Sequence, residues 1–144
     1  MALKVELKPN EQIIIGSCVV TNTDQRARLL IDGHNLPILR EKDIMTPAIA
    51  DTPAKLVYLA VQLMYLQPDP RINHGAYFNL ILDIVTAAPG AWPIIEEINN
   101  HILSGQMYQA LKHAGKLIAF EKKLSDQLEA RRKATGGTEE RRSA

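Results

Sequence analysis

The first third of the chain alternates between apolar and polar positions over short distances. Leu3, Val5 and Leu7 alternate with charged residues, which is the period-two pattern of a strand with one buried face. Further short apolar runs follow, several of them rich in β-branched residues, and turn residues separate them. We therefore expect five short antiparallel strands within residues 1–45, in a meander or a small barrel.

Turn residues predict how these strands are connected. Pro9-Asn10 predicts a turn after the first strand, and Gly16-Ser17 predicts a bulge or a sharp bend between the second and the third. Asp32-Gly33 predicts a hairpin that brings the last strand back against the fourth. Pro37 lacks the N–H that a central strand would donate, so the last strand should lie at an edge.

The hydrophobic period becomes helical after residue 45. Asp51-Thr52-Pro53 is typical of a helix start, and apolar residues then recur at three- and four-residue spacing. Further helices are expected over about 76–88, 92–104 and 106–133. The predicted fold class is α+β, with a β-module (1–45) followed by a helical domain of about four helices (46–133). The tail (134–144), which contains Thr135-Gly136-Gly137, is predicted to be disordered.

Composition favours a small cytoplasmic protein. The chain has 144 residues, 46% of them hydrophobic, and its one cysteine excludes an internal disulfide. The apolar run beside Cys18 favours a buried thiol. Lys4, Glu6 and Lys8 interrupt any apolar core of a signal peptide, and no apolar stretch approaches the ~20 residues of a membrane-spanning helix. We therefore expect a soluble protein without a membrane partner.

Residues that commonly carry catalysis or bind metals form no recognised motif. Glu96 and Glu97 are adjacent on a predicted helix, so their carboxylates point about 100° apart and do not converge on a substrate. Cys18 alone completes no zinc motif. The histidines lie too far apart for a recognised metal spacing: His34, His74, His101 and His113. We expect no enzymatic activity, no cofactor and no bound metal.

Charge is unevenly distributed along the chain. Residues 1–45 carry six basic and six acidic side chains, 46–110 carry two and five, and 111–144 carry nine and five. A basic C-terminal segment suits nucleic acid or an acidic partner, but a solvated helix end has the same composition. The β-module contains no aromatic residue and so lacks the stacking platform of many single-strand RNA binders. Its cations could form one patch if the first and last strands pair, or ordinary salt bridges with its acids.

Several longer blocks of sequence resemble one known family. They are, in order, MALKVELKPNEQIIIG, DQRARLLIDG, PILREKDI, DTPAKLVYLAVQLMYL and EEINNHILSG. Together they resemble the FlbT family of flagellum biosynthesis regulators over about residues 1–125. The resemblance implies a post-transcriptional repressor that associates with the 5′ untranslated region of flagellin mRNA and promotes its decay. It also implies a second regulator, FlaF, as a direct partner, but it carries over no site residue.

The β-module alone is also similar to the CsrA family of mRNA-binding translational regulators. The similarity lies in EQIIIG at 11–16 and REKDI at 40–44. In that family basic residues of the first strand and an arginine of the last strand contact RNA, and the matching positions here are Lys8 and Arg40. Leu7 stands where a preceding basic residue is expected, and Lys42-Asp43 makes the final block one residue longer.

These resemblances lead to a candidate RNA site. We expect Arg40 to bind a base edge or a phosphate, and Lys8 to neutralise a phosphate, with Arg28 and Lys42 in support. The helices would dock a FlaF-like protein, and a homo-oligomer is left open. The alternative is an adaptor or chaperone-like partner of FlaF or flagellin that affects mRNA only indirectly. The balanced charge of residues 1–45 favours this alternative, because a dedicated RNA surface should be more basic.

Overall fold

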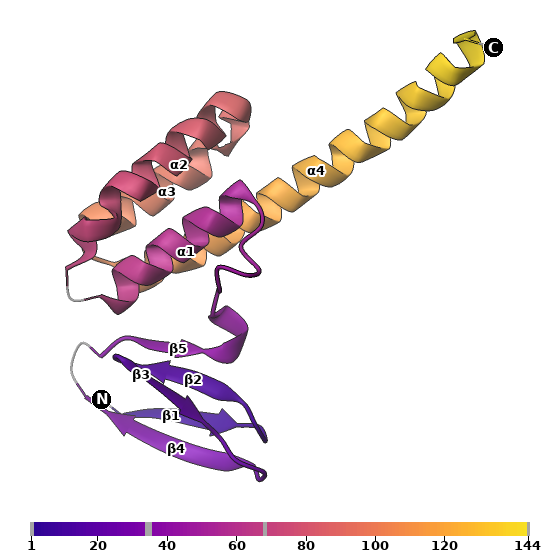
Figure 1. Cartoon of the computed structure of the whole chain (residues 1–144). Coiled ribbons are helices and arrows are strands. Elements are labelled where there is room, and N and C mark those ends of the chain that lie inside the picture. Colours follow the sequence, from indigo (N-terminus) through magenta and orange to yellow (C-terminus); the bar gives the residue numbers. More distant parts are fainter. Residues whose placement is uncertain (1, 34–35, 68, 144) are drawn as a thin grey trace.

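The computed structural model describes residues 2–33, 36–67 and 69–143, and strands precede helices in it, which confirms the α+β class. The strands are β1 (Ala2–Leu7), β2 (Gln12–Ile15), β3 (Cys18–Thr21), β4 (Ala27–Asp32) and β5 (Ile38–Arg40). The helices are α1 (Pro53–Leu66), α2 (His74–Ala87), α3 (Trp92–Leu103) and α4 (Met107–Ser143). Three short 3₁₀ helices connect them: η1 (Glu41–Asp43), η2 (Pro70–Asn73) and η3 (Pro89–Ala91). The strands lie together on one side of the helices (Figure 1).

The strands form two small antiparallel sheets instead of one meander. β1 pairs with β4, and a second sheet has the order β3-β2-β5. The predicted hairpin at Asp32-Gly33 is therefore wrong, and β1 and β5, the first and last strands, do not pair with each other. The reason lies in Leu39, which is 1% exposed and packs into the core between the helices. Its strand partner Ile14 packs against the same core, so β5 is placed beside β2.

The shorter turn predictions are confirmed. Asn10 has a φ of 65°, in the left-handed region that asparagine tolerates. Gly16 has a φ of 62° and lies between Ile15 and Cys18, which pair across the β2–β3 hairpin. An added Cβ at Gly16 would lie 3.0 Å from a side-chain carbon of Leu36, so both conformation and space favour glycine. β5 is an edge strand, as its proline predicted.

The main hydrophobic core lies between the helices. α1 begins as predicted, with the Thr52 hydroxyl accepting a hydrogen bond from the Lys55 N–H at 3.3 Å. α1 and α3 both pack against α4. Fully buried side chains of this core include Val57, Val61, Ile95, Ile98 and Leu117. A smaller core between the two sheets contains Val5, Leu7 and Ile13.

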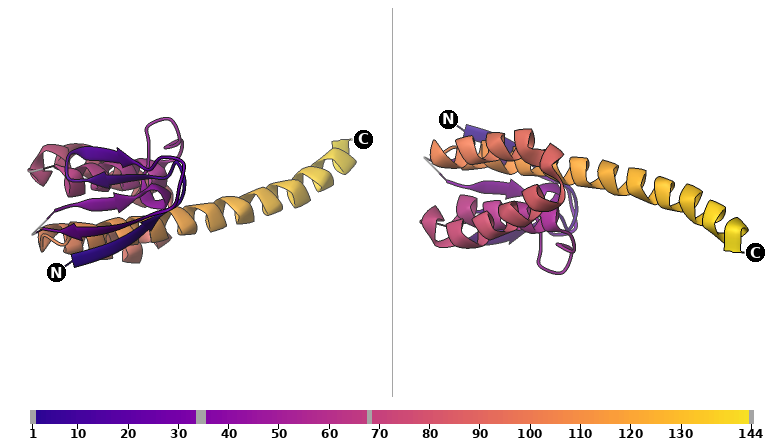
Figure 2. Two further views of the ribbon diagram at one scale, coloured as in Figure 1. Left: turned by 90° about the horizontal axis from the view of Figure 1, so that it is seen from below. Right: turned by 90° about the horizontal axis from the view of Figure 1, so that it is seen from above.

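Two further predictions differ from the structure. α4 continues to Ser143, through the segment predicted to be disordered. Its C-terminal end extends beyond the other helices in both views of Figure 2. Glu139, Glu140, Arg141 and Arg142 are favourable helix formers, and they support a helix beyond Thr135-Gly136-Gly137. Cys18 is exposed rather than buried, because every residue of β3 faces solvent. In the ranges given above, no helix is both apolar enough and long enough to cross a membrane.

Candidate nucleic-acid interface

One face of α1 holds the segment that carries Arg40 and Lys42. Tyr58, Gln62 and Tyr65 follow one another at i, i+4 and i+7, so they lie on the same side of the helix. Their polar groups bond to the main chain of residues 38–45, which we call the β5–η1 segment. Within it, the Met45 N–H donates to Oε1 of Gln62 at 2.7 Å. The Gln62 amide in turn donates to the Met45 carbonyl at 2.9 Å.

The two tyrosines complete this attachment. The Tyr58 hydroxyl donates to the carbonyl of Asp43 at 2.6 Å. Burial, together with the negative charge of Asp43, raises the pKa of Tyr58 to about 12. The Tyr65 hydroxyl donates to the carbonyl of Ile38 at 3.1 Å and accepts from its N–H at 3.0 Å. Tyr65 therefore covers the edge of β5, where these groups would otherwise remain open for pairing.

Arg40 reaches β1 through its side chain, although the two strands do not pair. Its guanidinium donates to the main-chain carbonyl of Glu6 at 3.2 Å. The Glu6 carboxylate instead forms an ion pair with Arg26 at 2.9 Å. Because Arg40 bonds to an uncharged carbonyl, that contact does not neutralise its positive charge.

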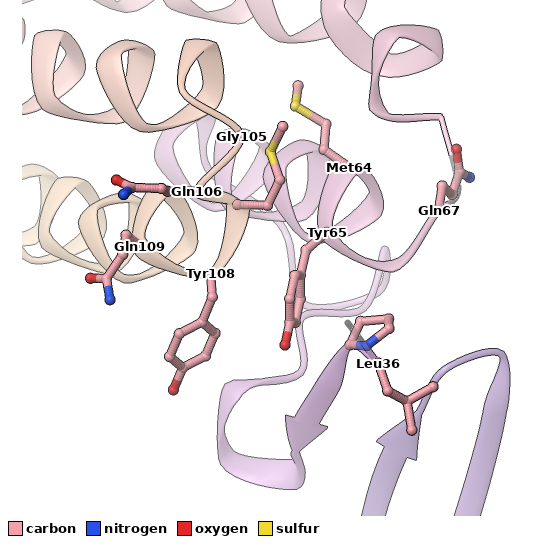
Figure 3. A pocket seen from close by; sticks show the side chains of 10 residues that line it. Leu36, Met64, Tyr65, Gln67, Gly105, Gln106, Tyr108 and Gln109 are labelled. Carbon is pink, nitrogen blue, oxygen red and sulfur yellow. The ribbon is translucent and has the colours of Figure 1, made fainter. Parts of the chain in front are cut away.

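An exposed aromatic ring lies beside the β5–η1 segment. Tyr108, in the first turn of α4, is 41% exposed, and its ring centroid is 5.7 Å from that of Tyr65. Both rings point from the helices toward the strands, next to Leu36 (Figure 3). They line a cleft of about 400 Å³ at the junction of strands and helices. The β-module thus gains from α1 and α4 the aromatic groups that its own sequence lacks.

One cation lies over the Tyr108 ring, and three more line the clefts to which that ring belongs. Nζ of Lys112 lies 4.9 Å from the ring centroid, within the range of a cation–π interaction. Tyr108 also lines a cleft of about 320 Å³ with Lys4 and Arg40, and another of about 330 Å³ with Lys42 and Lys112. Lys4 also lines a further cleft of about 520 Å³, together with Arg28. We call this set of residues the junction surface: Lys4, Arg28, Arg40, Lys42, Tyr108 and Lys112.

The structure thus brings together three of the four predicted RNA-binding residues. Arg28, Arg40 and Lys42 belong to the junction surface, whereas Lys8 lies in the turn after β1 and lines none of these four clefts. Sequence reasoning missed Tyr108 and Lys112. Both are far from the β-module along the chain, and nothing in their local spacing signals this location. The surface is not uniformly basic, because Asp43 lines two of its clefts.

Comparison with known proteins places the chain in a family. A family model described as "Flagellar protein FlbT" matches residues 3–125. The chain belongs to the FlbT family. It is 72% identical over 130 residues to "Probable flagellum biosynthesis repressor protein FlbT 1" of Bradyrhizobium diazoefficiens, covering 90% of this chain and 89% of that protein. The predicted resemblance to FlbT is therefore confirmed.

More distant FlbT proteins match over a similar length. "Probable flagellum biosynthesis repressor protein FlbT" of Rhodopseudomonas palustris is 49% identical over 86% of this chain and 98% of its own length. "Flagellum biosynthesis repressor protein FlbT" of Caulobacter vibrioides is 32% identical over 84% and 87%. These names describe regulators rather than enzymes. No solved structure matches the chain significantly, and its similarity to CsrA stays a prediction.

Proposed function

We propose that this FlbT-family chain represses flagellin expression after transcription, in the cytoplasm, by binding the 5′ untranslated region of flagellin mRNA through the junction surface. The observation that carries the proposal is the exposed Tyr108 ring among the cations of that surface. A ring of this kind can stack on an unpaired base, and neighbouring lysines and arginines can hold the phosphates on either side. Decay of the message would then follow from blocked translation or from recruitment of a nuclease.

Salt dependence tests the electrostatic part of this proposal. Binding of purified protein to a flagellin leader RNA should weaken steeply as salt rises, because bound phosphates release counterions. Arg40→Gln should lower the slope of log K against log salt by about 0.7, the value for one phosphate of a single strand. Lys8→Gln should change the slope less, because Lys8 lies outside the clefts. Arg71→Gln removes an exposed cation of η2 and serves as the charge-matched control.

Tyr108→Leu tests the stacking part separately. It keeps an apolar side chain at the position but removes the ring, so affinity should fall roughly 5- to 150-fold, as expected for a stacking energy of about 1–3 kcal/mol. The salt slope should stay unchanged, because no charge is lost. Equal binding by wild type, Arg40→Gln and Tyr108→Leu would refute RNA binding at the junction surface.

The second candidate function is a protein-interaction adaptor, and exposed apolar side chains on and beside α2 favour it. Ile72, Phe78 and Leu82 are 74%, 48% and 66% exposed. Side chains of this type commonly mark a protein-docking surface when they gather on one face. The same RNA titration, repeated with a FlaF-like protein, separates the two functions. Binding of RNA only in the presence of that protein would support the adaptor and contradict direct recognition.

A further inference from the structure

Three potential metal ligands converge between α3 and α4. Glu97 and His101 are four residues apart on α3, and His113 faces them from α4. Their ligand atoms all lie within 4.8 Å of one another. Oε2 of Glu97 is 3.9 Å from Nε2 of each histidine, which is too long for a direct hydrogen bond.

The Nδ1 atom of each histidine ring already has a hydrogen-bond partner. Nδ1 of His113 lies 2.9 Å from the main-chain carbonyl oxygen of Gln109, which can only accept a hydrogen bond. Nδ1 of His101 lies 2.9 Å from Oε1 of Gln106, also an acceptor. Each Nδ1 therefore carries its hydrogen, and in a neutral ring each Nε2 presents a lone pair toward Glu97. Metal-binding histidines are commonly oriented by such a bond from their other nitrogen.

Two imidazole lone pairs and a carboxylate that face one another repel unless a proton, a water molecule or a metal ion lies between them. Two nitrogens and one oxygen form a typical donor set for Zn²⁺, which leaves a fourth position for water. Bond lengths of about 2.0–2.1 Å require ligand atoms roughly 3.3 Å apart in a tetrahedral site. The observed separations are 3.9 Å from Glu97 to each histidine and up to 4.8 Å within the set, so side-chain rotations must draw the three ligand atoms together to reach this value. The histidine side chains are 23% and 18% exposed, so an ion can enter from solvent.

We propose that Glu97, His101 and His113 bind a Zn²⁺ ion that links α3 to α4. The link would lie close to the short connection between these helices and would make their relative position depend on the metal. None of the three residues belongs to the junction surface, so this proposal does not rest on RNA binding there.

Titration of the full-length protein with Zn²⁺ tests this site. The protein should be free of any histidine tag and carry Cys18→Ser, because an exposed thiol is itself a strong zinc ligand. Calorimetry should show one ion per chain, and saturation at about 100 Kd should raise Tm by roughly 5–10 °C. His101→Asn and His113→Asn should each abolish both effects, while circular dichroism shows that the variants remain folded.

Two further variants distinguish a built site from scattered histidines. Gln106→Ala removes the partner that orients His101 and should weaken zinc binding about 10- to 100-fold. Glu96→Gln removes the neighbouring exposed carboxylate and should leave binding unchanged. The proposal is wrong if wild type binds no zinc, or if the two histidine variants bind it as wild type does.

Discussion

The strands and the helices differ in how much they bury. In the part of the chain that the structure describes, the core between the two sheets contains three buried residues, whereas the helical core contains seventeen. One of those seventeen is Leu39, which comes from β5. Small sheets with few buried side chains are marginally stable alone. The comparison indicates that the helices stabilise the β-module, through Leu39 and through the α1 side chains bonded to the β5–η1 segment.

The largest effect should come from the helical core. Ile95 is fully buried there, so Ile95→Ala should lower the free energy of unfolding by about 2–5 kcal/mol. Leu30→Ala, at a 62% exposed position on β4, should change it by less than about 0.5 kcal/mol. Urea unfolding followed by Trp92 fluorescence and by amide NMR signals of the strands measures both. If the strands unfold separately from the helices, their dependence on the helical core is refuted.

A smaller effect is expected where α1 holds the β5–η1 segment. Gln62 is 4% exposed and bonds to both main-chain groups of Met45. Gln62→Met keeps the volume but leaves those groups without their partner, so the free energy of unfolding should fall by about 1–3 kcal/mol. Leu63→Met, at the neighbouring exposed position, is the matched control. Chemical denaturation compares them, and equal stability would mean that this attachment is not needed.

The smallest effect at neutral pH concerns Tyr58. Tyr58→Phe removes the hydrogen bond to the Asp43 carbonyl and should cost about 0.5–1.5 kcal/mol. Folding raises the pKa of Tyr58 from 10.0 to about 12, chiefly by burial. The folded chain thus keeps a proton that the unfolded chain loses, so stability from this group is complete below pH 10 and is lost between pH 10 and 12.

The variant should therefore lose less stability than wild type over that pH range, and thermal unfolding at several pH values measures the difference. Tyr108→Phe removes an exposed hydroxyl and should change stability by less than about 0.5 kcal/mol at neutral pH. Parallel pH profiles for wild type and Tyr58→Phe would contradict the role assigned to the buried hydroxyl.

Local sequence signals predicted the elements well, because their causes are local. The Thr52 cap, Gly16 and the period-two pattern of β1 each act within a few residues. Strand order was not predictable in this way. It depends on Leu39 and Tyr65, which join β5 to the helices across more than twenty residues of chain.

The candidate site was only partly predictable for the same reason. Arg28, Arg40 and Lys42 were identified by residue type, but Tyr108 joins them only through the packing of α4 against α1. The histidine cluster was missed because only the spacing of the histidines along the sequence was compared with that of known metal-binding motifs. His101 and His113 are brought together by the antiparallel arrangement of two helices, which single-motif spacing does not describe. His34 lies outside the described residues.

The bonds from α1 to the β5–η1 segment have a consequence for sequence variation. All of these bonds involve main-chain atoms of Ile38, Asp43 and Met45, so they do not depend on which side chains the segment carries. The side chain of Lys42 can therefore change without removing any of these bonds, and replacing Arg40 would remove only its own bond to the Glu6 carbonyl. Within one fold, the charge that this surface presents is free to diverge while the scaffold that presents it stays constant.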